Sequence, residues 1–68
     1  MENNARNVII RRRDVESRTG LSRSTIYHYI KEGTFPKPIK LGERAVGWLE
    51  SEVESWITDR IENRDSGN

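Results

Sequence analysis

The segment Thr19-Gly20-Leu21-Ser22 constrains this chain more than any other, because it separates two short stretches with helical character. Gly20 can adopt the left-handed backbone conformation that often ends a helix. Ser22 can begin the next helix by accepting a hydrogen bond from a backbone N–H of its first turn. A short, glycine-containing turn between two short helices is typical of a helix-turn-helix. The segment therefore predicts one helix over about 13–19 and a second over 23–32.

The residues on either side of this unit have a different hydrophobic period. Val8-Ile9-Ile10 is a β-branched run, which predicts a strand. After Gly33, two prolines exclude a helix. Apolar residues then alternate over 39–41 and 46–48, with a turn at 42–44 between them, and this pattern predicts a β-hairpin.

The last segment returns to a helical period. Ser51 and Glu54 have the spacing of a capping box, so we expect a helix to begin at Ser51. Its apolar stripe and the end of the hairpin supply the expected core cluster, which consists of Trp48, Val53, Trp56 and Ile57. Ile61 continues the stripe, one turn further along.

The order of elements is strand, helix, turn, helix, hairpin, helix. A hairpin directly after a helix-turn-helix is a wing, so the predicted fold is mainly α with a small β-hairpin: a winged helix-turn-helix with an N-terminal strand. A chain of 68 residues has room for one small domain. We expect that domain over 8–63, with disordered tails at 1–7 and 64–68.

The net charge of +1 conceals a division between two parts of the chain. Residues 1–46 hold ten basic and five acidic residues, a net charge of +5, whereas residues 47–68 hold two basic and six acidic residues, a net charge of −4. Such asymmetry points to an acidic partner for the basic part. The alternative is a chance distribution of solvated charges.

The second helix presents a polar stripe away from its apolar face. Its members, which follow the i, i+3, i+4, i+7 spacing of one helix face, are Ser24, Tyr27, His28 and Lys31. Together with the positive dipole end at Arg23 and Thr25, this stripe suits a polyanion. An α-helix fits the major groove of DNA, where side chains contact base edges. The alternative is an ordinary solvated face.

Further basic residues lie outside this helix. Lys37, Lys40 and Arg44 surround the hairpin, where Arg44 at the turn could contact a phosphate or a narrow minor groove. The run Arg11-Arg12-Arg13 could neutralise flanking phosphates, with Arg12 and Arg13 as its candidate site residues. The alternative for each group is that its charges only keep the surface soluble. Trp48 and Trp56 are assigned to the core rather than to base stacking.

Other chemistries find little support in the residues. With no Cys and one His, the chain can form neither a disulfide framework nor a four-ligand zinc site. His28 has no second ligand and no nucleophile beside it, so we expect no metal, no cofactor and no catalytic residue. The polar N-terminus carries no secretory signal and the apolar runs are too short to span a bilayer. We therefore expect a cytoplasmic protein.

Several motifs resemble the AlpA family of phage and prophage regulators over roughly residues 8–61. The most specific are T-G-L-S-R-S-T-I-Y from Thr19 and F-P-K-P from Phe35. The resemblance implies a MerR-like, excisionase-related winged fold, in which the second helix is the recognition helix and the hairpin is the wing. His28 stands where this pattern usually has Arg, which removes the bidentate fork that contacts guanine. The target sequence therefore does not carry over.

The resulting hypothesis is a sequence-specific, double-stranded DNA-binding transcriptional regulator of a prophage or integrative element. Because so small a domain makes few phosphate contacts, we expect tandem sites or self-association. Two alternatives remain open. One is an excisionase-type architectural DNA-binding factor. The other is an interaction module whose acidic last helix, over about 52–63, docks on an integrase or another protein.

Overall fold

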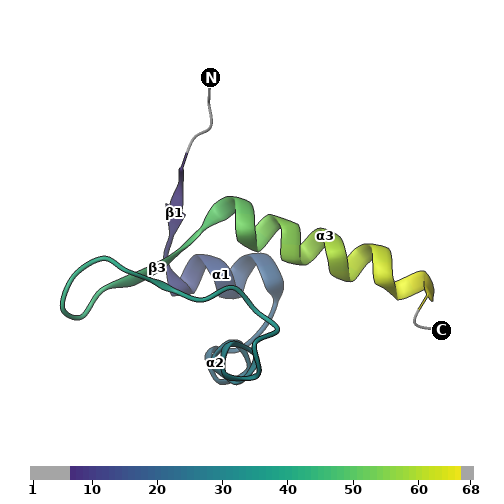
Figure 1. Cartoon of the computed structure of the whole chain (residues 1–68), viewed down its shortest axis with the longest axis horizontal. Coiled ribbons are helices and arrows are strands. Elements are labelled where there is room, and N and C mark those ends of the chain that lie inside the picture. The colour runs from purple at the N-terminus through teal and green to yellow at the C-terminus, as the bar shows by residue number, and fades with distance from the viewer. Residues whose placement is uncertain (1–6, 67–68) are drawn as a thin grey trace.

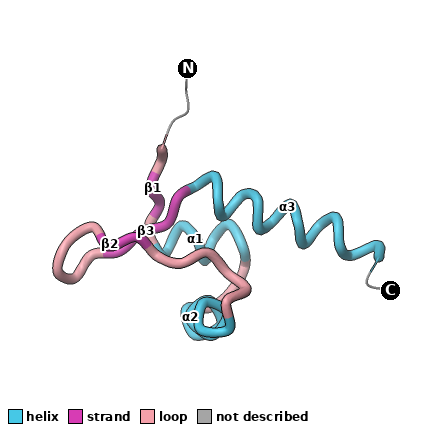
Figure 2. The backbone as a smooth tube through the Cα atoms, in the orientation of Figure 1, coloured by secondary structure: helices cyan, strands magenta, loops and turns pink. Residues whose placement is uncertain are grey.

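Strand β3 (Val46–Leu49) is the centre of a three-stranded antiparallel sheet in the computed structural model, which describes residues 7–66. The edge strands β1 (Ile9–Ile10) and β2 (Ile39–Lys40) pair with it on either side. Figure 2 shows that β2 and β3 form the base of a protruding loop, which is the wing. The backbone N–H groups of Leu41 and Gly42 donate to the carbonyl of Ala45, which closes this loop.

Gly47 allows β1 to lie close against the central strand. A Cβ atom at this position would overlap Cγ2 of Ile9 and would lie 3.0 Å from the carbonyl oxygen of Ile10. On the other side it would lie 3.2 Å from a methyl group of Leu41. The sheet therefore has no room for a larger residue here without displacing one of its edges.

Three helices complete the fold: α1 (Arg12–Thr19), α2 (Arg23–Glu32) and α3 (Glu50–Ser66). In Figure 1, α2 is seen end-on while α1 runs across the view, so the two helices of the helix-turn-helix cross at a wide angle. Helix α3 follows β3 without a linker and extends well past α1. The predicted winged helix-turn-helix with an N-terminal strand is confirmed.

Every helix, two of the three strands and the loop after α2 each contribute one buried hydrophobic side chain to the core. The six buried hydrophobic residues, from β1, α1, α2, the loop after α2, β3 and α3 in chain order, are Ile10, Val15, Ile26, Phe35, Trp48 and Val53. In the expected cluster, Trp48 and Val53 are fully buried, whereas Trp56 and Ile57 are partly buried and pack against the six. Because the core is so small, each of the six buried hydrophobic residues holds a different part of the fold in place.

Both tryptophans hold the loop between α2 and the wing. The indole N–H of Trp48 donates to the carbonyl of Pro36 over 3.0 Å, and that of Trp56 donates to the carbonyl of Thr34 over 2.7 Å. Neither carbonyl is paired in a helix or strand, so the indoles satisfy backbone groups that the prolines keep out of regular structure.

Helix α3 differs from its expected form in three respects. It begins at Glu50 rather than Ser51, so Ser51 lies inside the helix and the expected capping box is wrong; Glu54 pairs with Arg18 of α1. Ile61, the last member of the expected apolar stripe, is 51% exposed, because this turn lies beyond the core. The helix also continues to Ser66, so residues 64–66 of the expected C-terminal tail are helical. Residues 1–6 and 67–68 of the expected tails lie outside the described residues.

An ion-pair network joins α1 to α3. Nη1 of Arg18 lies 2.8 Å from a carboxylate oxygen of Glu50 and 3.1 Å from one of Glu54. The hydrogen bond that Arg18 donates to Glu50 raises the pKa of Arg18, aided by the charge of both carboxylates and opposed by desolvation. The guanidinium is therefore charged throughout the working range of a protein, and added salt screens its attraction to the two carboxylates.

Candidate nucleic-acid interface

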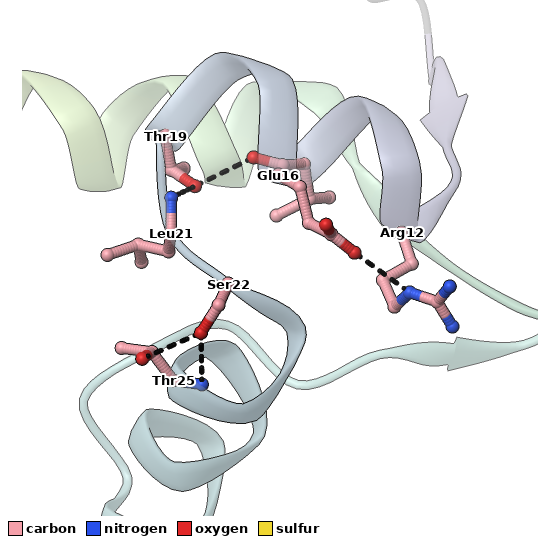
Figure 3. Close-up of polar contacts among 7 residues, drawn as sticks. Arg12, Glu16, Thr19, Leu21, Ser22 and Thr25 are labelled. Atoms are coloured by element: carbon pink, nitrogen blue, oxygen red, sulfur yellow. Dashed lines mark hydrogen bonds and ion pairs between the residues drawn. The ribbon is translucent and has the colours of Figure 1, made fainter.

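The turn between α1 and α2 is built from local hydrogen bonds (Figure 3). Gly20 has φ of 75°, and its N–H donates to the carbonyl of Glu16, which ends α1. The hydroxyl of Thr19 donates to the carbonyl of Val15 over 2.7 Å and accepts from the N–H of Leu21 over 3.2 Å. The turn is thus fixed at both ends, and it sets the direction in which α2 leaves.

Ser22 caps α2 as the sequence predicts. Its hydroxyl oxygen accepts from the backbone N–H of Thr25 over 3.2 Å, and its own proton goes to the hydroxyl of Thr25 over 3.0 Å (Figure 3). The half-buried Thr25 is therefore part of the cap. The cap leaves other N–H groups of the first turn available, and the helix dipole adds partial positive charge there.

The outward face of α2 is open to solvent. Ser24, His28 and Lys31 are exposed, and Tyr27 is 37% exposed. Nε2 of His28 lies 3.3 Å from a carboxylate oxygen of Glu32, one turn further along the helix. The four side chains are thus exposed, as the helical spacing predicts, and each can donate or accept hydrogen bonds. Their role in contacting bases stays a prediction.

Tyr27 connects this face to the core. Its ring meets the buried Trp48 edge-on, with ring centroids 6.3 Å apart and planes at 64°. On its other side, Cζ of Arg23 lies 6.0 Å from the centroid of the same ring. Such a stack restricts the arginine, because a guanidinium is attracted to the face of an aromatic ring. Tyr27 is therefore placed to hold Arg23 at the N-terminus of α2.

An open depression of about 530 Å³ lies beside these residues. We call it the arginine groove, since five of its lining residues are arginines: it is formed by Arg11, Arg12, Arg13, Arg23, Tyr27, Glu43, Arg44 and Val46. These residues come from the start of α1, the first turns of α2 and the wing. The groove therefore brings together three basic groups that are far apart in the sequence, with one carboxylate among them.

The three consecutive arginines before and in α1 have different roles. Nε of Arg11 donates to the carbonyl of Val46 over 3.0 Å and so fastens α1 to the wing. Nε of Arg12 lies 3.0 Å from a carboxylate oxygen of Glu16, in a half-buried ion pair. Arg13 is exposed. Arg11, which was not singled out within its run, is thus the residue that shapes the groove. The position of Arg11 just before a helix is the only sequence feature that could have predicted this role.

The remaining basic candidates lie on and near the wing. Arg44 is exposed in the turn and lines the arginine groove. Lys40 is exposed on the edge strand β2, and Lys37 is exposed in the loop before it, but neither lines the groove. The structure therefore groups Arg44 with the arginines of α1 and α2, while the two lysines form an outer margin.

Residues 7–66 hold neither a cluster of metal ligands nor a membrane-spanning helix. Within that range, no three His, Asp or Glu side chains come together as metal ligands. No helix in the same range is both long and apolar enough to cross a bilayer.

The sequence is similar to known proteins. A sequence model of the family described as prophage CP4-57 regulatory protein (AlpA) matches residues 8–61. The protein ORF88 of Enterobacteria phage P4 is 52% identical over 48 residues, which cover 71% of this chain and 54% of that protein. The DNA-binding transcriptional activator AlpA of Escherichia coli (strain K12) is 36% identical over 66 residues, covering 88% of this chain and 94% of the activator. The chain thus spans about half the length of the phage relative.

Proposed function

This chain belongs to the AlpA family of prophage regulatory proteins, and from that premise we propose that it is a sequence-specific, double-stranded DNA-binding transcriptional regulator of a prophage or integrative element. The family is one of DNA-binding regulators and not an enzyme class. The observation that carries the proposal is the arginine groove beside the exposed face of α2. Five guanidiniums around one depression would neutralise phosphates on either side of a helix inserted in the major groove.

In this proposal the elements divide the work of binding. Helix α2 enters the major groove of the duplex, with the side chains nearest the bases being Ser24, Tyr27, His28 and Lys31. Arg23 and Thr25 bind phosphate at the N-terminus of α2. The wing places Lys40 and Arg44 on the adjacent backbone or in the minor groove, and Lys37 adds charge at its margin. Arg12 and Arg13 meet the flanking phosphates. The protein would then act in the bacterial cytoplasm.

An excisionase-type architectural factor would use the same surface, since it too needs charge beside the recognition helix. The name of the E. coli relative, a transcriptional activator, favours the regulator. In either role, a single domain of this size contacts few phosphates, so we expect two or more copies to bind tandem sites. A duplex with one site and a duplex with two sites would measure this cooperativity directly.

The proposal is tested by the salt dependence of DNA affinity. Labelled duplexes that tile the DNA around the gene are titrated with the chain at salt concentrations between 50 and 200 mM. We expect the logarithm of affinity to fall linearly with the logarithm of salt. Arg23→Ala and Arg44→Ala should each reduce the slope by about 0.9, the value for one lost phosphate contact.

The matched control is Arg60→Ala, which removes the same charge from α3, where Arg60 lies over Trp56 and outside the arginine groove. Its slope should equal that of the unmodified chain. Salt-independent binding, no binding to any tiled duplex, or an equal loss for all three variants would contradict the proposal.

His28 is expected to contribute to sequence preference rather than to general affinity. His28→Ala removes an exposed ring from the α2 face. We expect the affinity ratio between the best tiled duplex and a scrambled duplex to fall by roughly tenfold, within the range of one lost base contact. Competition titrations at one salt concentration measure this ratio. An equal loss on both duplexes would place His28 on a phosphate instead.

A further inference from the structure

A second depression, of about 500 Å³, lies between α3 and the loop Gly33–Pro36. Helix α3 lines it with five side chains: Ser51, Glu52, Ser55, Trp56 and Asp59. None of its lining residues belongs to the arginine groove. It is therefore a separate surface, which the proposed DNA contacts do not use. We call it the α3 depression.

The charged residues of the α3 depression are carboxylates. Glu52, Trp56 and Asp59 stand at i, i+4 and i+7, so they share one face of the helix. Both acids are exposed, and no Lys or Arg is among the described residues that line the depression. The nearby guanidinium of Arg60 is placed over the rings of Trp56 and Tyr29, at 4.7 Å and 5.7 Å from their centroids.

The aromatic wall of this depression is fixed by contacts within the chain. The indole N–H of Trp56 is already bonded to the carbonyl of Thr34 over 2.7 Å. Phe35, which is only 4% exposed, meets the Trp56 ring edge-on with centroids 5.0 Å apart. The partly buried Trp56 thus offers the depression only the part of its ring that lines it, and no free donor. A ligand would find this wall formed in advance, which lowers the entropic cost of binding.

An apolar wall beside two carboxylates has the chemistry that accepts a long basic side chain. The methylene stem of an arginine or lysine can lie on Trp56 and Pro36, while its charged head meets Glu52 or Asp59. The same carboxylates repel phosphate, so DNA is a poor occupant. We propose that the α3 depression docks an arginine-bearing segment of a partner protein. This charge complementarity is independent of DNA binding.

The proposal is tested with the full chain, without DNA, in low-salt buffer. The probes are two blocked nine-residue peptides, one with three arginines among glycines and serines and one with glutamates in place of the arginines. We expect the arginine peptide to shift the Trp56 indole N–H and the backbone amides of 33–35 in nuclear magnetic resonance titrations. The glutamate peptide should leave them unchanged.

Neutral variants of the two acids sharpen the test. Glu52→Gln and Asp59→Asn should each weaken the arginine peptide at least threefold. Glu62→Gln, which makes the same charge change on α3 outside the depression, should leave its affinity unchanged. All three variants should keep the DNA affinity of the unmodified chain, so a failure of docking is separable from a failure of the DNA proposal.

Three results would overturn the proposal. One is equal binding by all the variants, which would indicate diffuse attraction to an acidic helix. Another is a set of shifts confined to other residues. The third is saturation of the α3 depression by self-association of the chain, seen as concentration-dependent shifts of the same resonances without peptide, because the occupant would then be a second copy.

Discussion

The arginine groove and helix α3 differ in how they use charge. Around the groove, five guanidiniums from three elements converge with one carboxylate. On α3, Glu50 and Glu54 bind an arginine of α1, and Glu52 and Asp59 remain exposed. Helix α1 serves both regions. The near-zero net charge is therefore the sum of two surfaces of opposite sign, each organised by packing, and the position of each charge is more informative than the total.

The largest effect is expected where the two regions are joined. Trp48 on β3 lies between the wing and α3 and is fully buried. Trp48→Ala should cost about 3–5 kcal/mol, the usual range for truncating a buried aromatic residue. Because that approaches the whole stability of a small domain, the variant should be unfolded at 25 °C. Circular dichroism during urea titration measures this.

Trp56→Phe is the matched control for that measurement. It removes the hydrogen bond to Thr34 but keeps an aromatic ring on the surface of the core, so about 1 kcal/mol should be lost. If Trp48→Ala were to unfold at the same urea concentration as the unmodified chain, β3 would not be the junction between the two regions.

Substitutions of two arginines on α1 should have smaller effects, each confined to one of the two regions. Arg13→Ala removes a charge from the arginine groove, so the salt slope of DNA binding should fall by about 0.9 with little change in stability. Arg18→Ala removes the partner of Glu50 and Glu54, so the urea midpoint should fall while the salt slope stays constant. Matched DNA titrations and unfolding curves compare them. Interchanged or identical effects would remove the distinction between the two surfaces.

The smallest effect is expected at the far end of α3. Ile61→Ser should change the free energy of unfolding by less than about 0.5 kcal/mol, because the side chain is 51% exposed and lies beyond the core. Val53→Ala, on the buried part of the same helix, should cost more than about 1 kcal/mol and serves as the comparison. Equal losses would show that the whole length of α3 packs in solution.

The sequence predicted those parts of the fold that local interactions determine. Gly20, Ser22 and Gly33 end or begin helices through contacts within five residues, and the ends of α1 and α2 agree with the prediction to within one residue. The capping box expected at Ser51 is wrong because α3 follows β3 directly and already begins at Glu50, while Glu54 binds Arg18, 36 residues away. Ile61 was misassigned because a helical period continues whether or not a neighbouring element remains to cover it.

The candidate interface was predictable to a similar degree. The exposed face of α2 follows from helical geometry alone, and Arg44 follows from its place in a hairpin turn. Their meeting with the start of α1 does not, since it depends on the pairing of β1 with β3 and on the bond from Arg11 to Val46 across 35 residues. The different roles of the three consecutive arginines could not be predicted either, because they too depend on contacts between distant parts of the sequence.

The two indole hydrogen bonds to the loop after α2 have a spectroscopic consequence. The chain has only two tryptophans, and both donate to carbonyls of the same short loop, at Pro36 and Thr34. Intrinsic fluorescence therefore reports on the joint between the recognition helix and the wing without any added label. In Trp56→Phe the remaining tryptophan emission comes from Trp48 alone. That residue then serves as a single fluorescent probe of the position of the wing relative to the core.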